Sequence, residues 1–240
     1  MDSKDDQPEE SSKKKKSISA KPTPKEAKPL NLLHQMLKIS LVLSMIVDST
    51  STLNIGVASV LPPIANIDEN TPLHVVLVHA GVAVLSVCQI GLMLFIAFAL
   101  IQWMYRCYLN LEFVKQKGLS TTSSWTIIWW FVPVYNWIRP YSMMKEIYLA
   151  SATAGEEPDL KQKGPDYMKI WWACWVIQGL LGRSAELLMR YDPSSIIINF
   201  LSIGSNIFEI GAAVYLLKVL KVITEIQNKR IPGIQVNKIS

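Results

Sequence analysis

The sequence carries little charge for its length. Of its 240 residues, 18% are charged and 50% are hydrophobic, whereas soluble domains carry about 25% charged residues. Much of that charge falls in the first thirty positions, and the mean hydropathy is positive, at +0.24. Several segments approach the roughly 20 apolar residues that cross a bilayer. The composition therefore argues against a soluble domain and predicts an integral membrane protein.

Cysteine and histidine are scarce, with three of each. The cysteines lie in or beside apolar segments, at Cys88, Cys107 and Cys174, and form neither a disulfide framework nor a CxxC pair. We expect them to be small buried hydrophobic residues. His74 and His79 are five positions apart, so they do not share a helix face as an i, i+4 pair would. We predict no metal site and no cofactor.

The signature motifs of common enzyme sites are also missing. The chain has no HExxH zinc motif, no GxSxG nucleophile turn and no GxxxxGK phosphate loop. An enzyme acting on lipid head groups would need a catalytic pair at the inner face, and the sequence offers no such pair. We therefore expect a protein that is not an enzyme, with no catalytic residues.

The placement of the basic residues indicates a membrane protein and not a nucleic-acid-binding protein. The formal net charge is +5, but the lysines and arginines gather beside apolar segments, as topology signals do. We expect membrane lipids as partners, together with either an unidentified membrane protein or a second copy of the chain. No nucleic-acid partner is expected.

Residues 1–30 predict a disordered, charged tail. They hold a lysine block at 13–16 and a Lys/Pro-rich run, with few apolar residues to bury. They lack the apolar core and cleavage site of a signal peptide. One interpretation is a solvated tail that marks the cytoplasmic side, and the other is contact between the lysine block and anionic lipid.

Four segments predict membrane-spanning helices in an all-α transmembrane bundle. The spans cover about 37–61, 73–103, 171–189 and 195–217. We assign residues 31–226 to the transmembrane helical domain and residues 227–240 to a C-terminal cytoplasmic tail.

The stretch 125–141 is too short and too broken for an ordinary fifth span. Eight residues, Trp125 to Val132, precede Pro133, and eight residues rise only about 12 Å in a helix. Pro133 removes a backbone donor and disfavours helix in the residue before it, and Pro140 repeats the interruption. Two interpretations remain: a kinked full span, or a helix that returns to the side it left.

The placement of charge favours the returning helix. The lysine block at 13–16 and the end that carries Lys218, Lys221, Lys229 and Arg230 both belong on the cytoplasmic side. Both ends share one side only if the number of crossings is even. We therefore predict four spans plus a proline-broken re-entrant or interfacial helix, in the inner (plasma) membrane, with both termini cytoplasmic.

Four ionisable residues fall within the predicted spans: Asp48, Arg183, Glu186 and Glu209. In the four-span arrangement, Asp48 and Glu209 lie at similar depths, about 16 Å and about 13 Å from the inner ends of their spans. Two carboxylates at one depth can share a proton or bind a cation, and such residues mark functional sites. Arg183 is three positions from Glu186, with which it can pair, and its long side chain can also reach toward Glu209. Structural pairing between helices explains the four residues equally well.

Three runs carry a family resemblance: YRCYLNL at 105–111, WWFVPVYNWIRPY at 129–141 and MMKEIY at 143–148. With the Trp171-Trp172 pair, they resemble the DUF4328 family of uncharacterised, mainly bacterial integral membrane proteins, over roughly residues 73–230. The long charged tail and the polar first span depart from that pattern. The resemblance implies a multi-span bacterial membrane protein and supplies no activity. The positions that match the motif are Arg106, Asn110, Pro133, Asn136, Arg139, Pro140 and Tyr141.

We expect an architectural role for the motif residues. Asn136 can satisfy backbone groups that Pro133 frees, and Arg139 can cap carbonyls or bind a lipid phosphate. The leading hypothesis is a non-enzymatic membrane scaffold or regulatory interaction protein. The alternative is a small transporter, or an ion- or proton-coupled permeation protein, that uses Asp48 and Glu209.

Overall fold

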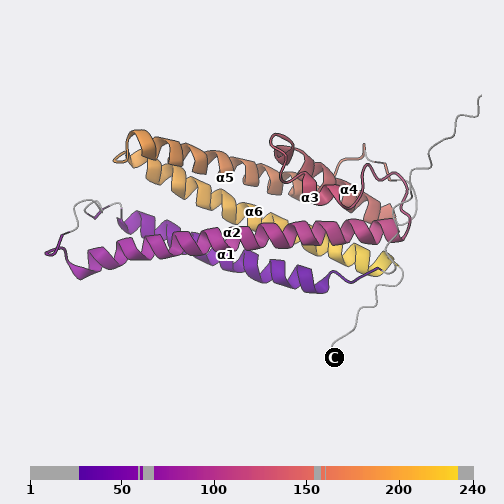
Figure 1. The fold of residues 1–240 in the computed structure, drawn as a ribbon, viewed down its shortest axis with the longest axis horizontal. Helices are drawn as coiled ribbons and strands as arrows, with labels where there is room; N and C mark the ends of the chain where they lie inside the picture. The colour runs from indigo at the N-terminus through magenta and orange to yellow at the C-terminus, as the bar shows by residue number, and fades with distance from the viewer. Residues whose placement is uncertain (1–26, 59, 62–67, 154–157, 160, 232–240) are drawn as a thin grey trace, which may run out of the picture.

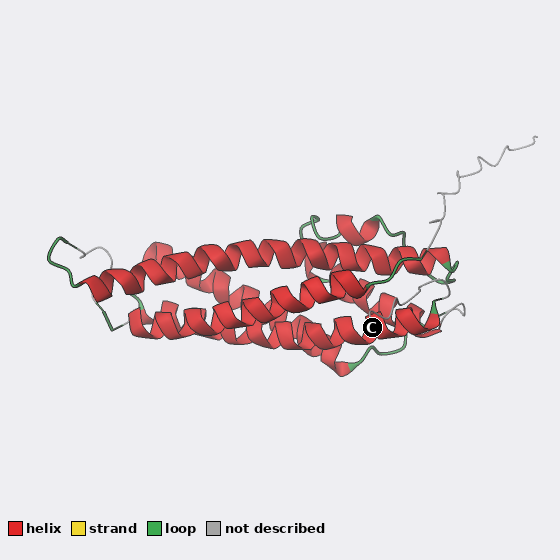
Figure 2. Cartoon of the chain, turned by 90° about the horizontal axis from the view of Figure 1, so that it is seen from below, coloured by secondary structure: helices red, strands yellow, loops and turns green. Residues whose placement is uncertain are grey.

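A computed structural model describes residues 27–58, 60–61, 68–153, 158–159 and 161–231. Within these ranges the regular structure is helical throughout and contains no strand (Figure 2), which confirms the predicted all-α class. The helices are α1 (Asn31–Ala58), α2 (Leu73–Phe113), α3 (Trp125–Ile128), the 3-10 helix η2 (Tyr135–Trp137), α4 (Arg139–Thr153), α5 (Asp166–Tyr191) and α6 (Ile196–Arg230).

Four long helices, α1, α2, α5 and α6, lie along the long axis of the molecule (Figure 1). α1 packs on both α2 and α6, and α5 packs on α6. Among the described elements, α2 and α5 have no extended contact with each other. The bundle therefore consists of two hairpins that meet mainly through α1 and α6.

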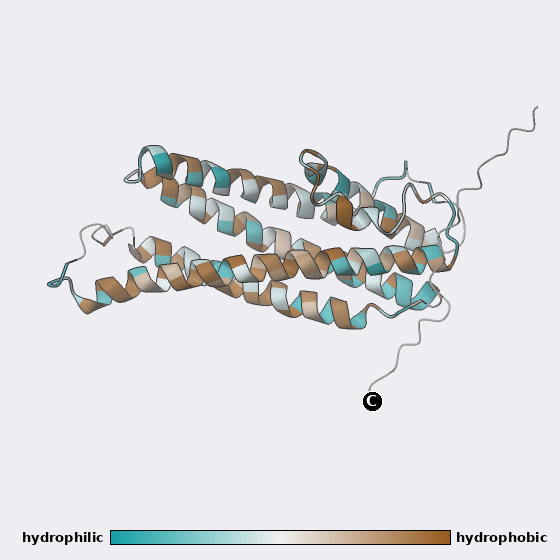
Figure 3. Cartoon of the chain, viewed as in Figure 1, coloured by the Kyte–Doolittle hydropathy of each residue, from teal (hydrophilic) through white to brown (hydrophobic). Residues whose placement is uncertain are grey.

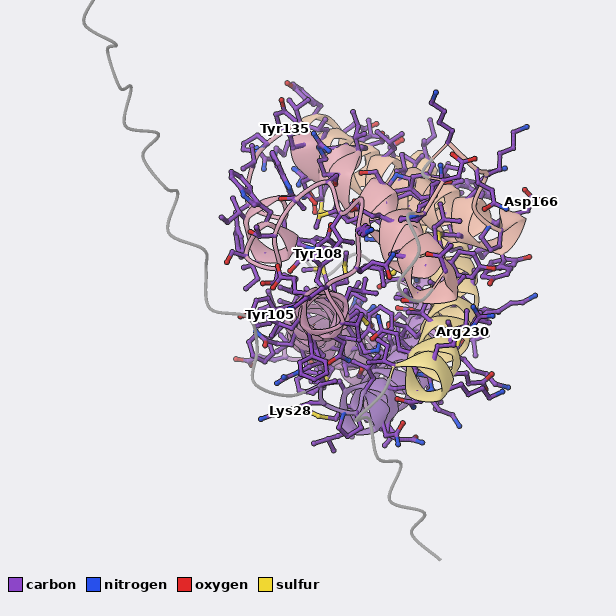
Figure 4. All side chains as sticks on the ribbon, turned by 90° about the vertical axis from the view of Figure 1, so that its right-hand side faces the viewer. Lys28, Tyr105, Tyr108, Tyr135, Asp166 and Arg230 are labelled. Atoms are coloured by element: carbon purple, nitrogen blue, oxygen red, sulfur yellow. The ribbon has the colours of Figure 1, made fainter. Side chains whose placement is uncertain are left out.

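The two ends of this bundle differ. At one end, which we call the proximal end, lie Lys28, the end of α2, α4, the start of α5 and Arg230 (Figures 1 and 4). The connections from α1 to α2 and from α5 to α6 lie at the opposite, distal end (Figure 1). The two ends of the described chain thus share one end of the bundle.

The fully buried side chains gather in the proximal half, where α2, α4, α5 and α6 converge. The largest of them there include Trp103, Met104, Tyr108, Met144, Ile147, Trp171, Leu220 and Ile223. Burying a large apolar side chain contributes about 1.5–3 kcal/mol. The proximal half is accordingly the well-packed core, and the two hairpins are more open toward the distal end.

The long helices expose many large apolar side chains and bury several polar ones. Val87 of α2 is 70% exposed and Phe200 of α6 is 68% exposed, whereas Asp48 of α1 is 1% exposed. In Figure 3, α2 is coloured mainly hydrophobic along its length, whereas α5 and α6 carry more hydrophilic segments. In soluble proteins carboxylates are mostly exposed and large exposed apolar patches are uncommon, so both features depart from the usual pattern.

By length and composition, α1 and α2 are each apolar enough to cross a membrane. This finding indicates association with a membrane, but it does not confirm the four spans that the sequence predicts. α5 is less apolar than α2 because it carries Arg183, Glu186 and Arg190 in its second half. α6 is also less apolar than α2, because it carries lysines toward its end.

Ordered, buried residues extend past two of the predicted boundaries. α6 continues beyond residue 226 to Arg230, and Gln227 is fully buried, so the helix includes the beginning of the predicted C-terminal tail. At the other end, Leu30 is fully buried and Ala27 is 6% exposed, although both lie in the predicted tail 1–30. Residues 1–26 and 232–240, the rest of the predicted tails, lie outside the described residues.

The stretch 125–141 does not run the length of the bundle (Figure 1). It folds as α3, a turn at Pro133 and η2, and leads into α4 at the proximal end. Pro140 is the second residue of α4 and does not interrupt it, because the first turn of a helix tolerates proline. The chain thus enters and leaves this stretch at the same end of the bundle.

Candidate functional site

A chain of polar side chains joins three helices inside the bundle. Ser44 Oγ donates a hydrogen bond to Asp48 Oδ2 over 3.3 Å, and both residues belong to α1. From α2, the Gln89 amide nitrogen Nε2 donates to Ser44 Oγ over 3.5 Å and to Glu209 Oε1 of α6 over 2.9 Å. We call these four residues the carboxylate chain. They connect the two acids that the sequence analysis placed at similar depth.

The other two predicted ionisable residues do not belong to this chain. Arg183 and Glu186 are both exposed on α5, and no ion pair joins them within the part of the chain that the structure describes. In the same part of the chain, no lysine or arginine pairs with Asp48 or Glu209. The two interior carboxyl groups therefore depend on neutral donors alone.

The polar stripe of α6 faces the other helices. Ser205 Oγ donates to the backbone oxygen of Gln178 in α5 over 3.0 Å, and Asn206 Nδ2 donates to Thr52 Oγ1 in α1 over 3.0 Å. Glycine permits close packing along the same pair of helices, since a Cβ at Gly182 would lie 3.4 Å from Ser205 Oγ. Polar groups thus help to hold α6 at the centre of the bundle.

A cavity of about 390 Å³ lies in the space that α2 and α5 leave open. Gln89, Ser44 and Glu209 line one end of it. At the other end it reaches the tryptophans of the proximal half and Asn136 of η2. The walls between are mainly apolar and come from α2, α5 and α6. Along α2 the lining extends from Gln89 to Leu100, a rise of about 16 Å.

Two oxygen atoms in the lining residues have no hydrogen-bond partner although they are buried. They are Gln89 Oε1 and Asn136 Oδ1. The expected role of Asn136 is not observed, because none of the described hydrogen bonds joins its side chain to the backbone around Pro133. A buried acceptor without a donor costs about 1–3 kcal/mol. A ligand that donated hydrogen bonds to these two oxygens would remove that cost.

The turn at Pro133, which precedes the cavity residue Asn136, is strained. Val134 has φ 67° and ψ −49°, and the Tyr135 backbone N–H donates to the Pro133 carbonyl over 2.8 Å. These values define a γ-turn of the rare, strained kind. Such backbone strain concentrates at functional sites, and here it positions Asn136 two residues later.

Arg139 and Tyr141, from the same motif, lie against aromatic rings. The Arg139 guanidinium carbon is 5.0 Å from the centroid of the Trp129 ring and 5.9 Å from that of Tyr135. The Tyr141 ring lies 6.4 Å from that of Trp172. Trp137 contacts Trp175, at 6.4 Å between centroids. The two ring contacts hold the stretch 125–141 against α5, and the Arg139 contacts lie within the stretch. Carbonyl capping by Arg139 is not among the described hydrogen bonds.

Asn110, another motif residue, is the centre of a buried network at the proximal end. Its Nδ2 donates to the Lys28 carbonyl over 3.0 Å and to Gln227 Oε1 over 3.1 Å, and its Oδ1 accepts from the Lys28 backbone N–H over 3.0 Å. Gln227 Nε2 donates in turn to Ser151 Oγ over 2.9 Å and to the Cys107 carbonyl over 3.2 Å. Asn110 therefore ties the incoming chain, α2, α4 and α6 together. Arg106 lies half-buried one turn earlier.

A second proximal cluster centres on Glu146 of α4. Its Oε1 accepts from Tyr108 Oη over 2.7 Å and from the Ser120 backbone N–H over 2.6 Å, and its Oε2 accepts from Ser120 Oγ over 2.6 Å. Figure 4 shows Tyr108 at this end, between the end of α2 and the segment that leads to α4. Glu146 thus fixes the connection after α2 to α4.

The predicted site residues do not include Ser44, Gln89, Glu146 or Gln227. Glu146 had a detectable signal, because it lies beside Met143, Ile147 and Ala150 on the apolar face of a helix, where an unpaired charge is costly. Gln89 had one as well, as an isolated amide within a long apolar run. Gln227 gave no comparable signal, because a glutamine is ordinary within a polar, basic segment.

This arrangement can accept hydrogen bonds and positive charge inside the bundle. It provides no group of three or more metal-ligating side chains among the described residues. The cavity combines an acidic, amide-lined end with apolar and aromatic walls, which suits a small apolar molecule oriented by a few polar groups.

Comparison with known proteins gives one assignment. No curated protein matches the chain, and no solved structure matches it. The family model described as Domain of unknown function (DUF4328) matches residues 70–225, which covers Gln89 and Glu209 of the carboxylate chain and the whole motif from Arg106 to Tyr141. This protein therefore belongs to the DUF4328 family.

Proposed function

We propose that this protein is a multi-pass protein of the inner (plasma) membrane in which α1, α2, α5 and α6 all cross the bilayer. The carrying observation is the apolar surface that all four helices expose, together with the interior carboxylates of α1 and α6. Leu180 of α5 is 53% exposed and Ile197 of α6 is 55% exposed, like the apolar residues of α1 and α2. Lipid is the environment that makes such a surface favourable.

The charges on α5 are compatible with a crossing. Arg183 is eight residues before Tyr191, the last residue of the helix, so it lies about 12 Å from the distal end. A long side chain at that depth can extend its charged group to the interface. α2 has 41 residues, twice the number needed to span, so its proximal part packs against α4 outside the hydrocarbon.

The shared end of the bundle supports the predicted orientation. Lys28 and Arg230 both lie at the proximal end, as does the chain on each side of the stretch 125–141. With the lysine-rich termini cytoplasmic, the proximal end faces the cytoplasm. The stretch 125–141 is then a non-crossing element that returns to the cytoplasmic side.

Within this framework we propose a non-enzymatic scaffold or regulatory role. The proximal end, fastened by Asn110 and Glu146, offers a rigid cytoplasmic platform of helix ends. The partners that fit are lipid and either an unidentified membrane protein or a second copy of the chain.

Ion- or proton-coupled permeation is the second candidate function. The observation that favours it is the carboxylate chain, in which two acids from different helices are linked through Ser44 and Gln89 without a basic partner. Ionisable residues inside membrane proteins commonly serve ion or proton pathways.

A labelling experiment tests the topology. The three native cysteines are replaced, and single cysteines are introduced at the exposed positions Lys117, Lys161, Asn70 and Ser194. We expect a membrane-impermeant maleimide to label Asn70 and Ser194 from the outside, and Lys117 and Lys161 only after the membrane is opened. Opposite sides for Lys117 and Lys161 would contradict the non-crossing element.

Flux measurements in proteoliposomes separate the two roles. A scaffold gives no proton or sodium flux above that of empty vesicles. A permeation protein gives a flux that Glu209→Gln and Asp48→Asn abolish and that Glu186→Gln, an equal charge change at an exposed position, leaves unchanged.

A further inference from the structure

We infer that the cavity between α2 and α5 binds a lipophilic amine, with its ammonium group at Glu209 and its apolar body along the walls of α2 and α5. The inference goes beyond the scaffold role and rests on the proposed function in one respect, the position of these helices in the membrane.

The polar groups of the cavity specify the charge of the ligand. Glu209 accepts a single hydrogen bond, from Gln89, and has no basic partner among the described residues. A carboxylate removed from water is stabilised by a counter-cation. An ammonium group supplies that charge, and an anionic or purely hydrocarbon ligand does not.

The unpartnered atoms specify hydrogen-bond donors. Gln89 Nε2 is already occupied by Ser44 and Glu209, which leaves its Oε1 as the free group beside the carboxylate. Asn136 Oδ1 is the second unpartnered acceptor of the lining. Both are acceptors, and the N–H groups of an ammonium bound at Glu209 can satisfy the nearer one, Gln89 Oε1. A quaternary ammonium would supply charge but no N–H donor.

The walls specify an apolar body. Between its two polar ends the cavity is lined by side chains such as Met93, Ile96 and Leu216 and by the rings of Trp171 and Trp175. Tryptophan faces attract cations as well as apolar groups. The volume of about 390 Å³ lies in the range of pockets for small organic ligands, about 300–1,000 Å³.

The open space between the hairpins suggests the entry route. α2 and α5 have no extended contact among the described elements, so the cavity lies where the two hairpins separate. In a bilayer, a lipophilic amine that has partitioned into the membrane can approach Glu209 without crossing the packed proximal core.

Tryptophan fluorescence provides a direct test, because Trp130, Trp171 and Trp175 line the cavity. The full chain in nanodiscs of zwitterionic lipid is titrated with a brominated long-chain primary amine, and in parallel with the brominated alcohol of the same chain length. We expect saturable quenching by the amine at concentrations at least tenfold below those of the alcohol. We expect Glu209→Gln to remove this preference and Glu186→Gln to keep it.

The native protein supplies a measurement that does not depend on any variant folding. The non-brominated amine should raise the melting temperature of the native chain more than the matched alcohol does. Equal quenching and equal stabilisation by amine and alcohol would reduce the cavity to a lipid-chain groove and overturn the inference. Saturable amine quenching that Glu209→Gln leaves unchanged would overturn it as well. The labelling result remains separate, since it reports topology regardless of what the cavity binds.

Discussion

Asn110 and Gln227, which are 117 positions apart, share a buried hydrogen bond of 3.1 Å. Each side chain makes further bonds, Asn110 to the Lys28 backbone and Gln227 to Ser151 and the Cys107 carbonyl. Four parts of the chain thus meet at two amides, close to the place where the described chain begins and ends. The proximal end depends on this pair for its closure.

We predict that Asn110→Leu destabilises the protein by about 3 kcal/mol, because it leaves the Lys28 backbone groups and Gln227 Oε1 without partners at about 1–3 kcal/mol for each unsatisfied group. Denaturant unfolding in mixed micelles, followed by tryptophan fluorescence, measures the loss. Gln227→Leu should have a similar effect, and the double variant should lose less than the sum, with a coupling of about 1 kcal/mol. Lys229→Ala, an exposed change two residues away, serves as the control. Strict additivity would show that the two amides act independently.

The second prediction concerns the connection after α2. Glu146 holds Ser120 by two hydrogen bonds, so Glu146→Leu should release the segment that contains Lys115 and Lys117, both on the exposed side of that connection. We expect trypsin to cleave there about tenfold faster, which corresponds to about 1.4 kcal/mol of lost local stability. Glu225→Leu removes an exposed carboxylate and should leave the rate unchanged. A rate equal to that of the native protein would mean that the Glu112–Ser123 bonds suffice.

Much of this architecture could be predicted from the sequence because it depends on local patterns. The apolar runs indicated α1, α2, α5 and α6, and the short segment before Pro133 indicated an element that does not run the length of the bundle. The similar depth of Asp48 and Glu209, which Ser44 and Gln89 connect, was predicted by counting rises along the two helices. Each of these inferences uses only helix geometry and the apolar character of the segment.

The remaining features depend on contacts between distant residues. The polar, basic sequence predicted a tail from residue 227, but Gln227 is buried and bonds to the Cys107 carbonyl and to Ser151, and the helix continues to Arg230. Leu30 suggested nothing by itself, because its burial depends on the core that Asn110 helps to close. The spacing of Arg183 and Glu186 predicted a shared face but not that this face points outward.

The third prediction tests the strained turn. Val134 occupies a positive-φ conformation that costs a β-branched residue about 1–2 kcal/mol, whereas glycine adopts it freely at an entropic cost of about 0.5–1 kcal/mol. We expect Val134→Gly to raise the melting temperature, by the equivalent of about 0.5–1 kcal/mol. Val132→Gly, two residues earlier and without a positive φ, should lower it. If both substitutions lower it equally, Val134 is not strained.

The last prediction separates stability from ligand binding at Asn136. Its Oδ1 is buried without a partner, so Asn136→Leu removes an unsatisfied acceptor and should stabilise the protein by about 1 kcal/mol. The same change lies at the end of the cavity away from Glu209, where the apolar body of the amine lies, so the brominated amine should bind Asn136→Leu at least as tightly as it binds the native chain. Asn206→Leu is the matched control, because Asn206 donates to Thr52 and is not among the residues that line the cavity. That variant should lose stability, by about 1–2 kcal/mol, and retain amine binding. An Asn136→Leu protein that is less stable than the native chain would show that the asparagine has an architectural role, as the motif alone suggested. A several-fold loss of amine affinity would show that the ammonium group lies at Asn136 and not at Glu209.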